Sequence, residues 1–128
     1  MKPARVLIID DNDMTIQLTT FVLRRAAFCV ESATDVNDGL RKIAAFGPDL
    51  ILMDIQMPDM DGLELTRRLK AAAVTRQIVV VAFTAYAMKG DEGKMRRAGC
   101  DGYISKPVDV RTLADQVRAC LTSGSRVG

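Results

Sequence analysis

The sequence predicts one α/β domain in which helices cover both faces of a parallel sheet. Short apolar runs alternate along the chain with longer segments whose apolar residues recur at helical spacing. Charged side chains follow three of the runs directly, namely Asp10 and Asp11, Asp54, and Lys106. Five strand-then-helix units in succession imply a parallel sheet with right-handed crossovers.

Five runs are expected to form strands. All are short, and most are apolar, as strands buried in a parallel sheet are. The fourth is the longest and the richest in β-branched residues, so we expect both of its faces to be buried. The predicted strands are residues 6–9, 28–31, 50–53, 78–83 and 103–105.

Five segments are expected to form helices. Gly47-Pro48 ends the second and Gly99 ends the fourth. The fourth is mostly polar, which indicates either an ordinary solvated face or an element of low stability that moves. The predicted helices are residues 13–27, 35–46, 62–73, 87–98 and 108–121.

The chain length of 128 residues fits a single domain. We expect this domain to occupy residues 1–122, and the polar residues 123–128 to form a flexible tail. Met1 and this tail favour a stand-alone protein, although a fragment of a larger protein remains an alternative.

Composition excludes several classes of function. A net charge of +2 with interspersed signs gives no support for binding to nucleic acid or a membrane surface. The absence of histidine excludes Ser-His-Asp and Cys-His catalysis within the chain, and leaves hard, oxygen-bound ions as candidate metals. Cys29, Cys100 and Cys120 have no metal-type spacing, so reduced thiols in a cytoplasmic protein are expected.

Three aspartates are expected to meet at one edge of the sheet. Asp10, Asp11 and Asp54 follow two strands, and the carboxyl ends of parallel strands lie at the same edge. Two such charges about 4 Å apart cost about 4 kcal/mol at an effective dielectric constant of about 20. Either one acid is protonated, or a divalent cation such as Mg²⁺ lies among them. The alternative is that Asp10, Asp11 and Asp13 cap the next helix, which is the role expected for Asp13.

Further candidate residues follow the same logic. Asp54 ends an apolar strand without starting a helix, which marks it as a nucleophile or metal ligand. Lys106 would neutralise a phosphoryl oxygen, although a solvated turn lysine is the simpler reading. The Lys106–Pro107 bond is of the type in which cis peptides occur. Thr84 would donate a hydrogen bond to a phosphoryl group, or cap the next helix.

These residues resemble those of response-regulator receiver domains. The similarity extends from Val6 to Leu121 and includes residues 6–11, 49–62 (DLILMDIQMPDMDG), Thr84-Ala85 and 103–107 (YISKP). It implies a flavodoxin-like fold of five strand–helix units with strand order 2-1-3-4-5. The segment TAYAMKG at residues 84–90 is most similar to stand-alone cell-cycle receivers and to receivers of hybrid histidine kinases.

The resemblance implies a division of roles at the acidic edge. Asp54 would be the phosphoacceptor. Asp10, Asp11 and Asp54 would bind Mg²⁺, with the backbone carbonyl of Gln56 as a further ligand.

The resemblance also implies how phosphorylation would change the conformation of the domain. Lys106 would pair with the phosphoryl group, Thr84 would hydrogen-bond it, and Tyr103 would change rotamer as the aromatic switch. Simple packing is the alternative for Tyr103. Tyr86, near the path of the hydrolytic water, is hypothesised to shield the phosphoaspartate.

The expected function is relay in a two-component phosphorelay, without turnover catalysis. A sensor histidine kinase or histidine phosphotransfer protein would donate the phosphoryl group, by docking on the first helix. A downstream protein would read the result, and the receiver would be a monomer or a phosphorylation-dependent dimer. A Mg²⁺-dependent phosphohydrolase and a degenerate binding module are the rival classes. Gln56 argues against the hydrolase, because such hydrolases place a second acid at this position. The intact acidic set argues against the degenerate module.

Overall fold

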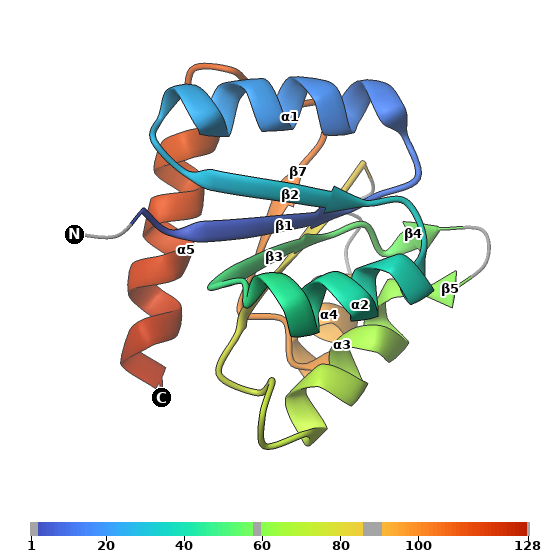
Figure 1. Ribbon diagram of the computed structural model, residues 1–128. Helices are drawn as coiled ribbons and strands as arrows, with labels where there is room; N and C mark the ends of the chain where they lie inside the picture. The colour runs from blue at the N-terminus through green and yellow to red at the C-terminus, as the bar shows by residue number, and fades with distance from the viewer. Residues whose placement is uncertain (1–2, 58–59, 86–90, 128) are drawn as a thin grey trace.

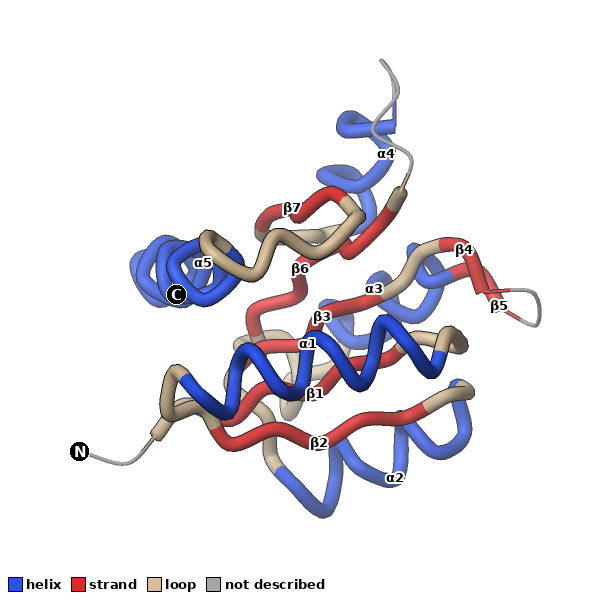
Figure 2. Tube along the Cα trace, turned by 90° about the horizontal axis from the view of Figure 1, so that it is seen from above, coloured by secondary structure: helices blue, strands red, loops and turns tan. Residues whose placement is uncertain are grey.

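The fold is a parallel sheet enclosed by two layers of helices (Figures 1 and 2). The computed structural model describes residues 3–57, 60–85 and 91–127. Within these residues the main sheet has five parallel strands in the order β2-β1-β3-β6-β7. Counted along the main sheet, this is the predicted order 2-1-3-4-5, so the flavodoxin-like prediction is confirmed.

The elements alternate along the chain as predicted. The strands of the main sheet are β1 (Arg5–Ile9), β2 (Cys29–Ala33), β3 (Leu50–Met53), β6 (Val79–Thr84) and β7 (Gly102–Ser105). The helices are α1 (Asp13–Arg25), α2 (Val36–Phe46), α3 (Gly62–Ala71), α4 (Asp91–Ala98) and α5 (Leu113–Val127). Among the described residues, no helix is both long and apolar enough to cross a membrane.

Alternating residues of the strands face opposite layers, because successive side chains of a strand point to opposite faces. On one face Val6 and Ile8 of β1 join a buried cluster with Leu23 of α1 and Val117 of α5. On the other face Leu7 and Ile9 join Ile43 of α2 and Leu65 of α3. The centre of the sheet is thus buried on both sides, which explains why β1, β3 and β6 read as nearly continuous apolar runs.

Several boundaries differ from the predictions. Asn12, and not Asp13, caps α1, since the Asn12 side chain accepts from the backbone N–H of Thr15 at 2.9 Å. Asp13 lies in the first turn, where its charge favours the positive end of the helix. The last helix starts at Leu113, five residues after the predicted start at 108, and continues to Val127. A short antiparallel pair, β4 (Gln56–Met57) and β5 (Met60–Asp61), was not predicted.

The predicted tail therefore overlaps a helix. The backbone at residues 123–127 continues α5 and does not form an irregular end. The domain boundary at residue 122 remains a prediction.

Ala27, which follows α1, has an unusual backbone conformation. Its φ is +71°, a region that disfavours a side chain with a Cβ atom. The backbone N–H of Phe28 donates to the carbonyl of Leu23 at 3.0 Å and closes the helix end. Replacement of Ala27 by glycine is expected to raise the free energy of unfolding by about 1 kcal/mol. Urea denaturation would measure this, and an unchanged or lower stability would contradict it.

Candidate functional site

The register of the sheet places two of the predicted acids side by side. Ile9 of β1 lies opposite Met53 of β3, so Asp10 and Asp54 follow at neighbouring strand ends. The backbone N–H of Asp54 donates to the carbonyl of Ile9 at 2.9 Å, which extends the ladder to Asp54. Strands β1 and β3 flank the point where the chain changes direction across the sheet, the usual ligand position in open α/β sheets.

The three predicted acids form one cluster. Single carboxylate oxygens of Asp10, Asp11 and Asp54 lie within 4.8 Å of one another. Asp10 is completely buried and Asp54 is 5% exposed, whereas Asp11 is exposed. The structure therefore brings together three like charges, two of them removed from water, and such a group needs a counter-charge.

Lys106 supplies part of that counter-charge. Its ammonium lies 2.7 Å from Oδ2 of Asp10 and 3.8 Å from Oδ2 of Asp54. The Lys106 side chain is 16% exposed, and its ammonium lies 5.2 Å from the centre of the Phe83 ring. The Lys106–Pro107 peptide bond is cis. Lys106 is thus not a solvated turn lysine but a partly buried partner of the acids.

Two further hydrogen bonds to the acids come from backbone groups. The N–H of Asn12 donates to Oδ1 of Asp10, and the N–H of Gln56 donates to Oδ1 of Asp54, each at 2.9 Å. These bonds fix the orientation of both carboxylates. In each case the donor lies two residues after the acid, Asn12 as the N-cap of α1 and Gln56 as the first residue of β4.

The pKa of Asp54 is raised above its usual value. Burial of the carboxyl group is the main cause, and the charges of Asp10 and Asp11 add to it. The Gln56 N–H and the Lys106 ammonium act in the opposite direction. The site therefore disfavours the charged form of Asp54 until a further cation binds nearby.

Asp54→Asn is expected to stabilise the metal-free protein by about 1 kcal/mol at neutral pH, because it removes a buried charge. Folding favours protonated Asp54, so this benefit is absent below the pKa of an unfolded aspartate, about 3.9, and appears as the pH rises through the raised pKa. Thermal denaturation of both proteins in EDTA from about pH 4 to about pH 8 would test this. A variant less stable than the wild type at neutral pH would contradict it.

Thr84 and Tyr103 lie on the neighbouring strands β6 and β7, and Lys106 directly follows β7. Thr84 ends β6 and is buried, and its carbonyl accepts from the N–H of Lys106 at 2.8 Å. Tyr103 on β7 is 41% exposed and lines a small hollow with Met95 and Arg96 of α4. The two are therefore in neighbouring strands, while Tyr86 lies outside the described residues.

Gly62 is a structural requirement of the site that was not predicted from the sequence. A Cβ atom at Gly62 would lie 2.5 Å from the carbonyl oxygen of Asp54 and 2.8 Å from Cα of Ile55. The start of α3 thus packs directly against the loop that leaves Asp54. The signal was present in the Asp61-Gly62 match to the receiver loop, but spacing alone did not show what the glycine contacts.

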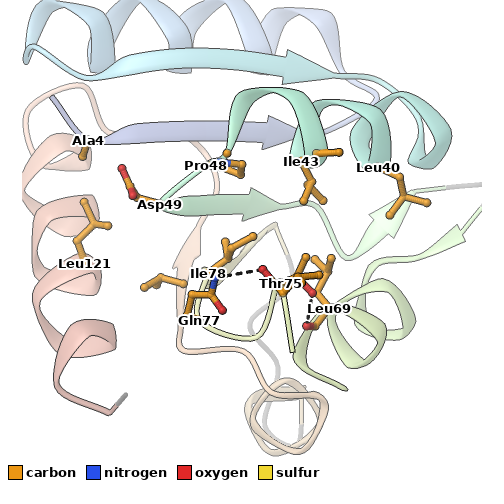
Figure 3. A pocket seen from close by; sticks show the side chains of 14 residues that line it. Ala4, Leu40, Ile43, Pro48, Asp49, Leu69, Thr75, Gln77, Ile78 and Leu121 are labelled. Carbon is orange, nitrogen blue, oxygen red and sulfur yellow. Dashed lines mark hydrogen bonds between the residues drawn. The ribbon is translucent and has the colours of Figure 1, made fainter. Parts of the chain in front are cut away.

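A hollow of about 840 Å³ lies at the opposite end of the sheet (Figure 3). Apolar side chains such as Ile43, Leu69 and Ile78 line it, and the Thr75 hydroxyl donates to the Leu69 carbonyl at 2.6 Å. Asp49 is the one ionisable residue in this lining of described residues. The hollow lacks the grouped acids and lysine of the other edge, so we take the acidic cluster as the functional site.

Comparison with known proteins shows to which family the chain belongs. The family model for the response regulator receiver domain matches residues 6–118. The polar-differentiation response regulator DivK of Brucella anthropi is 38% identical over 119 residues, which are 93% of this chain and 97% of that protein. DivK of Brucella ovis is 38% identical over 116 residues, 91% of this chain and 94% of that protein.

Solved structures show the same architecture. A CheY-like response regulator receiver domain protein from Methanospirillum hungatei JF-1 is 31% identical, with a TM-score of 0.86 over 98% of this chain and 99% of that one. The receiver domain of sensor histidine kinase PA1611 from Pseudomonas aeruginosa PAO1 is 27% identical, with a TM-score of 0.82 over 94% and 98%. The chain therefore belongs to the receiver domains of two-component response regulators.

Proposed function

We propose that Asp54 accepts a phosphoryl group from a phosphohistidine of a partner protein, so that the chain relays a signal and does not turn over a substrate. The observation that carries this proposal is the pairing of a buried, oriented carboxylate with one lysine and two further acids. An oxygen of Asp54 would bond to phosphorus as the phosphorus–nitrogen bond of the donor breaks, and the electron pair of that bond would leave with the imidazole.

The site fits a Mg²⁺ ion. Its donors are oxygens only, and their three charges exceed the single charge of Lys106. Asp10, Asp11 and Asp54 would hold the ion, with the backbone carbonyl of Gln56 as a further ligand. Bound there, Mg²⁺ would neutralise charge on the carboxylates and on a phosphoryl oxygen. The PA1611 receiver, described with a magnesium ion in its active-site cleft, supports this assignment.

Neighbouring residues would hold and report the phosphoryl group. Lys106 would move its ammonium from Asp10 and Asp54 toward a phosphoryl oxygen, and Thr84 would donate its hydroxyl. Tyr103 would then change position on β7. Contacts of this kind, made in only one state, shift a two-state equilibrium by about 10- to 1000-fold. A downstream protein would read the altered surface around α4, β7 and α5.

Phosphorylation itself is tested with a small acyl phosphate. The protein would be incubated with acetyl phosphate, with Mg²⁺ or with EDTA, and analysed by intact mass spectrometry. We expect a mass increase of one phosphoryl group that needs Mg²⁺ and is lost in Asp54→Asn. Steady release of phosphate without an adduct would favour a hydrolase, and no adduct without Mg²⁺ binding would favour a degenerate module.

The donor is proposed to dock on α1. Met14, Leu18 and Phe21 are 79%, 40% and 59% exposed, and their spacing places them on one side of the helix. They line a hollow of about 470 Å³ together with Pro107 and Val108, next to Lys106. An apolar stripe of this kind fits a helix of the donor. Leu18 lies at the surface and not in the core.

Met14→Asp is expected to slow phosphorylation by a phosphohistidine protein about tenfold and to leave phosphorylation by acetyl phosphate unchanged. The reason is that Met14 is exposed, so the change affects docking and not the site. Val74→Asp is the matched control, since Val74 is 80% exposed at the other end of the molecule. Equal rates for Met14→Asp and wild type with the protein donor would refute docking on α1.

A further inference from the structure

Lys70, in the last turn of α3, joins three segments of the chain. Its ammonium donates to the carbonyl of Ile78 at 2.7 Å, the carbonyl of Arg76 at 3.2 Å and Oδ2 of Asp101 at 2.7 Å. An ammonium has three donors, so these acceptors use all of them. The Lys70 side chain is 21% exposed. Lys70 therefore cross-links α3 to the segments that precede β6 and β7.

Asp101 is held to β6 in two further ways. Its Oδ2 atom also accepts from the N–H of Val80 at 2.9 Å. Its own N–H donates to the carbonyl of Val80 at 2.7 Å. The start of β7 is thus fixed to β6 by main chain and side chain, and to α3 through Lys70.

The C-terminal end of α4 packs onto the same point. Gly99, which follows α4, has a φ of +104°, and a Cβ there would lie 2.8 Å from Cγ of Lys70. Met95 and Ala98 in the second half of α4 are each 2% exposed. The first half includes Gly93, which weakens a helix. Helix α4 packs beside α3 (Figure 1). Its buried side chains, among those described, thus lie in its C-terminal half.

We propose that Lys70, Gly99 and Asp101 form a fixed pivot, the Lys70 anchor, for the switching movement of α4. The phosphorylation site lies at the other end of β6 and β7, where Thr84 and Lys106 meet. If a helix is fixed at its C-terminal end and phosphorylation rearranges the structure near its N-terminal end, the helix rotates about the fixed end. This inference rests on the proposed function, because phosphorylation of Asp54 provides the change.

The test measures amide hydrogen exchange by NMR in the full chain, before and after phosphorylation by acetyl phosphate with Mg²⁺. The amides of Gly99, Cys100 and Asp101, which donate to Arg96, Met95 and Val80, report on the anchor. We expect their exchange rates to change by less than about threefold on phosphorylation, while the amide signals of Gly93 and Lys94 shift. A change of about tenfold or more at the three amides would overturn the pivot.

A variant separates the anchor from the phosphorylation chemistry. Lys70→Met is expected to raise exchange of the three amides about tenfold even without phosphorylation, while Arg67→Met, on the exposed side of α3, leaves them unchanged. Equal exchange in Lys70→Met and wild type would refute the anchor. If Lys70→Met does not fold, the exchange rates of the wild-type protein before and after phosphorylation still test the pivot. Absence of a phosphoryl adduct by mass would refute the proposed function instead, and the unphosphorylated comparison would then judge the anchor alone.

Discussion

Replacing Lys106 with methionine is expected to lower the free energy of unfolding by about 3 kcal/mol at neutral pH without metal. Lys106 is 2.7 Å from Asp10, which is completely buried, and the variant leaves that acid and Asp54 without a described cationic partner. Removal of one member of a buried ion pair is costly because the other charge stays buried. Urea denaturation of both proteins in EDTA would measure the difference.

Two further results are expected for Lys106→Met if the lysine acts through its charge. Lys106 opposes the raised pKa of Asp54, so its loss raises that pKa further, and the destabilisation should shrink as the pH falls. Mg²⁺ should stabilise the variant more than the wild type, because the ion replaces the missing charge. Lys94→Met, at an exposed lysine of α4, is the control and should change stability by less than about 0.5 kcal/mol. A similarly small effect for Lys106→Met would show that the acids do not depend on the lysine.

Gly62→Ala is expected to destabilise the protein by about 3 kcal/mol and to slow phosphorylation of Asp54. The added methyl group would lie 2.5 Å from the Asp54 carbonyl oxygen, so backbone must move at the loop that orients the acid. Gln56, which follows Ile55 and begins β4, donates its N–H to Asp54, so both stability and reactivity should fall. Thermal denaturation and the rate of adduct formation with acetyl phosphate would test the two effects.

Gly39→Ala provides a matched control within α2. A methyl group there would lie 3.0 Å from Cδ1 of Ile9, which is the end of a flexible side chain. Alanine also favours the helix by about 1 kcal/mol over glycine. We expect a net change within about 1 kcal/mol and no effect on phosphorylation. Equal losses in the two variants would show that the close approach at Gly62 has no special role.

The architecture could be predicted because the three central strands, β1, β3 and β6, are buried on both faces. A short run such as Leu50–Met53, in which every side chain is buried, fits a central strand better than any other element. The segments between such runs are marked as helices by the spacing of their apolar residues. Helix ends were less predictable, because caps depend on which side chain reaches a backbone N–H. Asn12 and Asp13 both suit a cap by type, and only the structure shows that Asn12 makes the bond.

The acids and Lys106 could be predicted as one site because parallel strands deliver their ends to one edge. The distances between these side chains could not be predicted, because they depend on side-chain rotamers and burial. For the same reason the sequence did not indicate that Lys106 lies closer to Asp10 than to Asp54. The Phe83 ring near Lys106 was missed for the same reason. The Lys70 contacts to Arg76, Ile78 and Asp101 join segments distant in sequence, and no motif marks them.

The most direct test of the account is the location of the phosphoryl group. The protein phosphorylated by acetyl phosphate and Mg²⁺ would be reduced with borohydride, which converts an acyl phosphate into an alcohol, and then digested and sequenced by mass spectrometry. We predict the modification at Asp54 alone, with Asp10 and Asp11 unmodified. Modification of Asp10 or Asp11, or a phosphoryl group on a hydroxyl side chain that resists borohydride, would contradict the account.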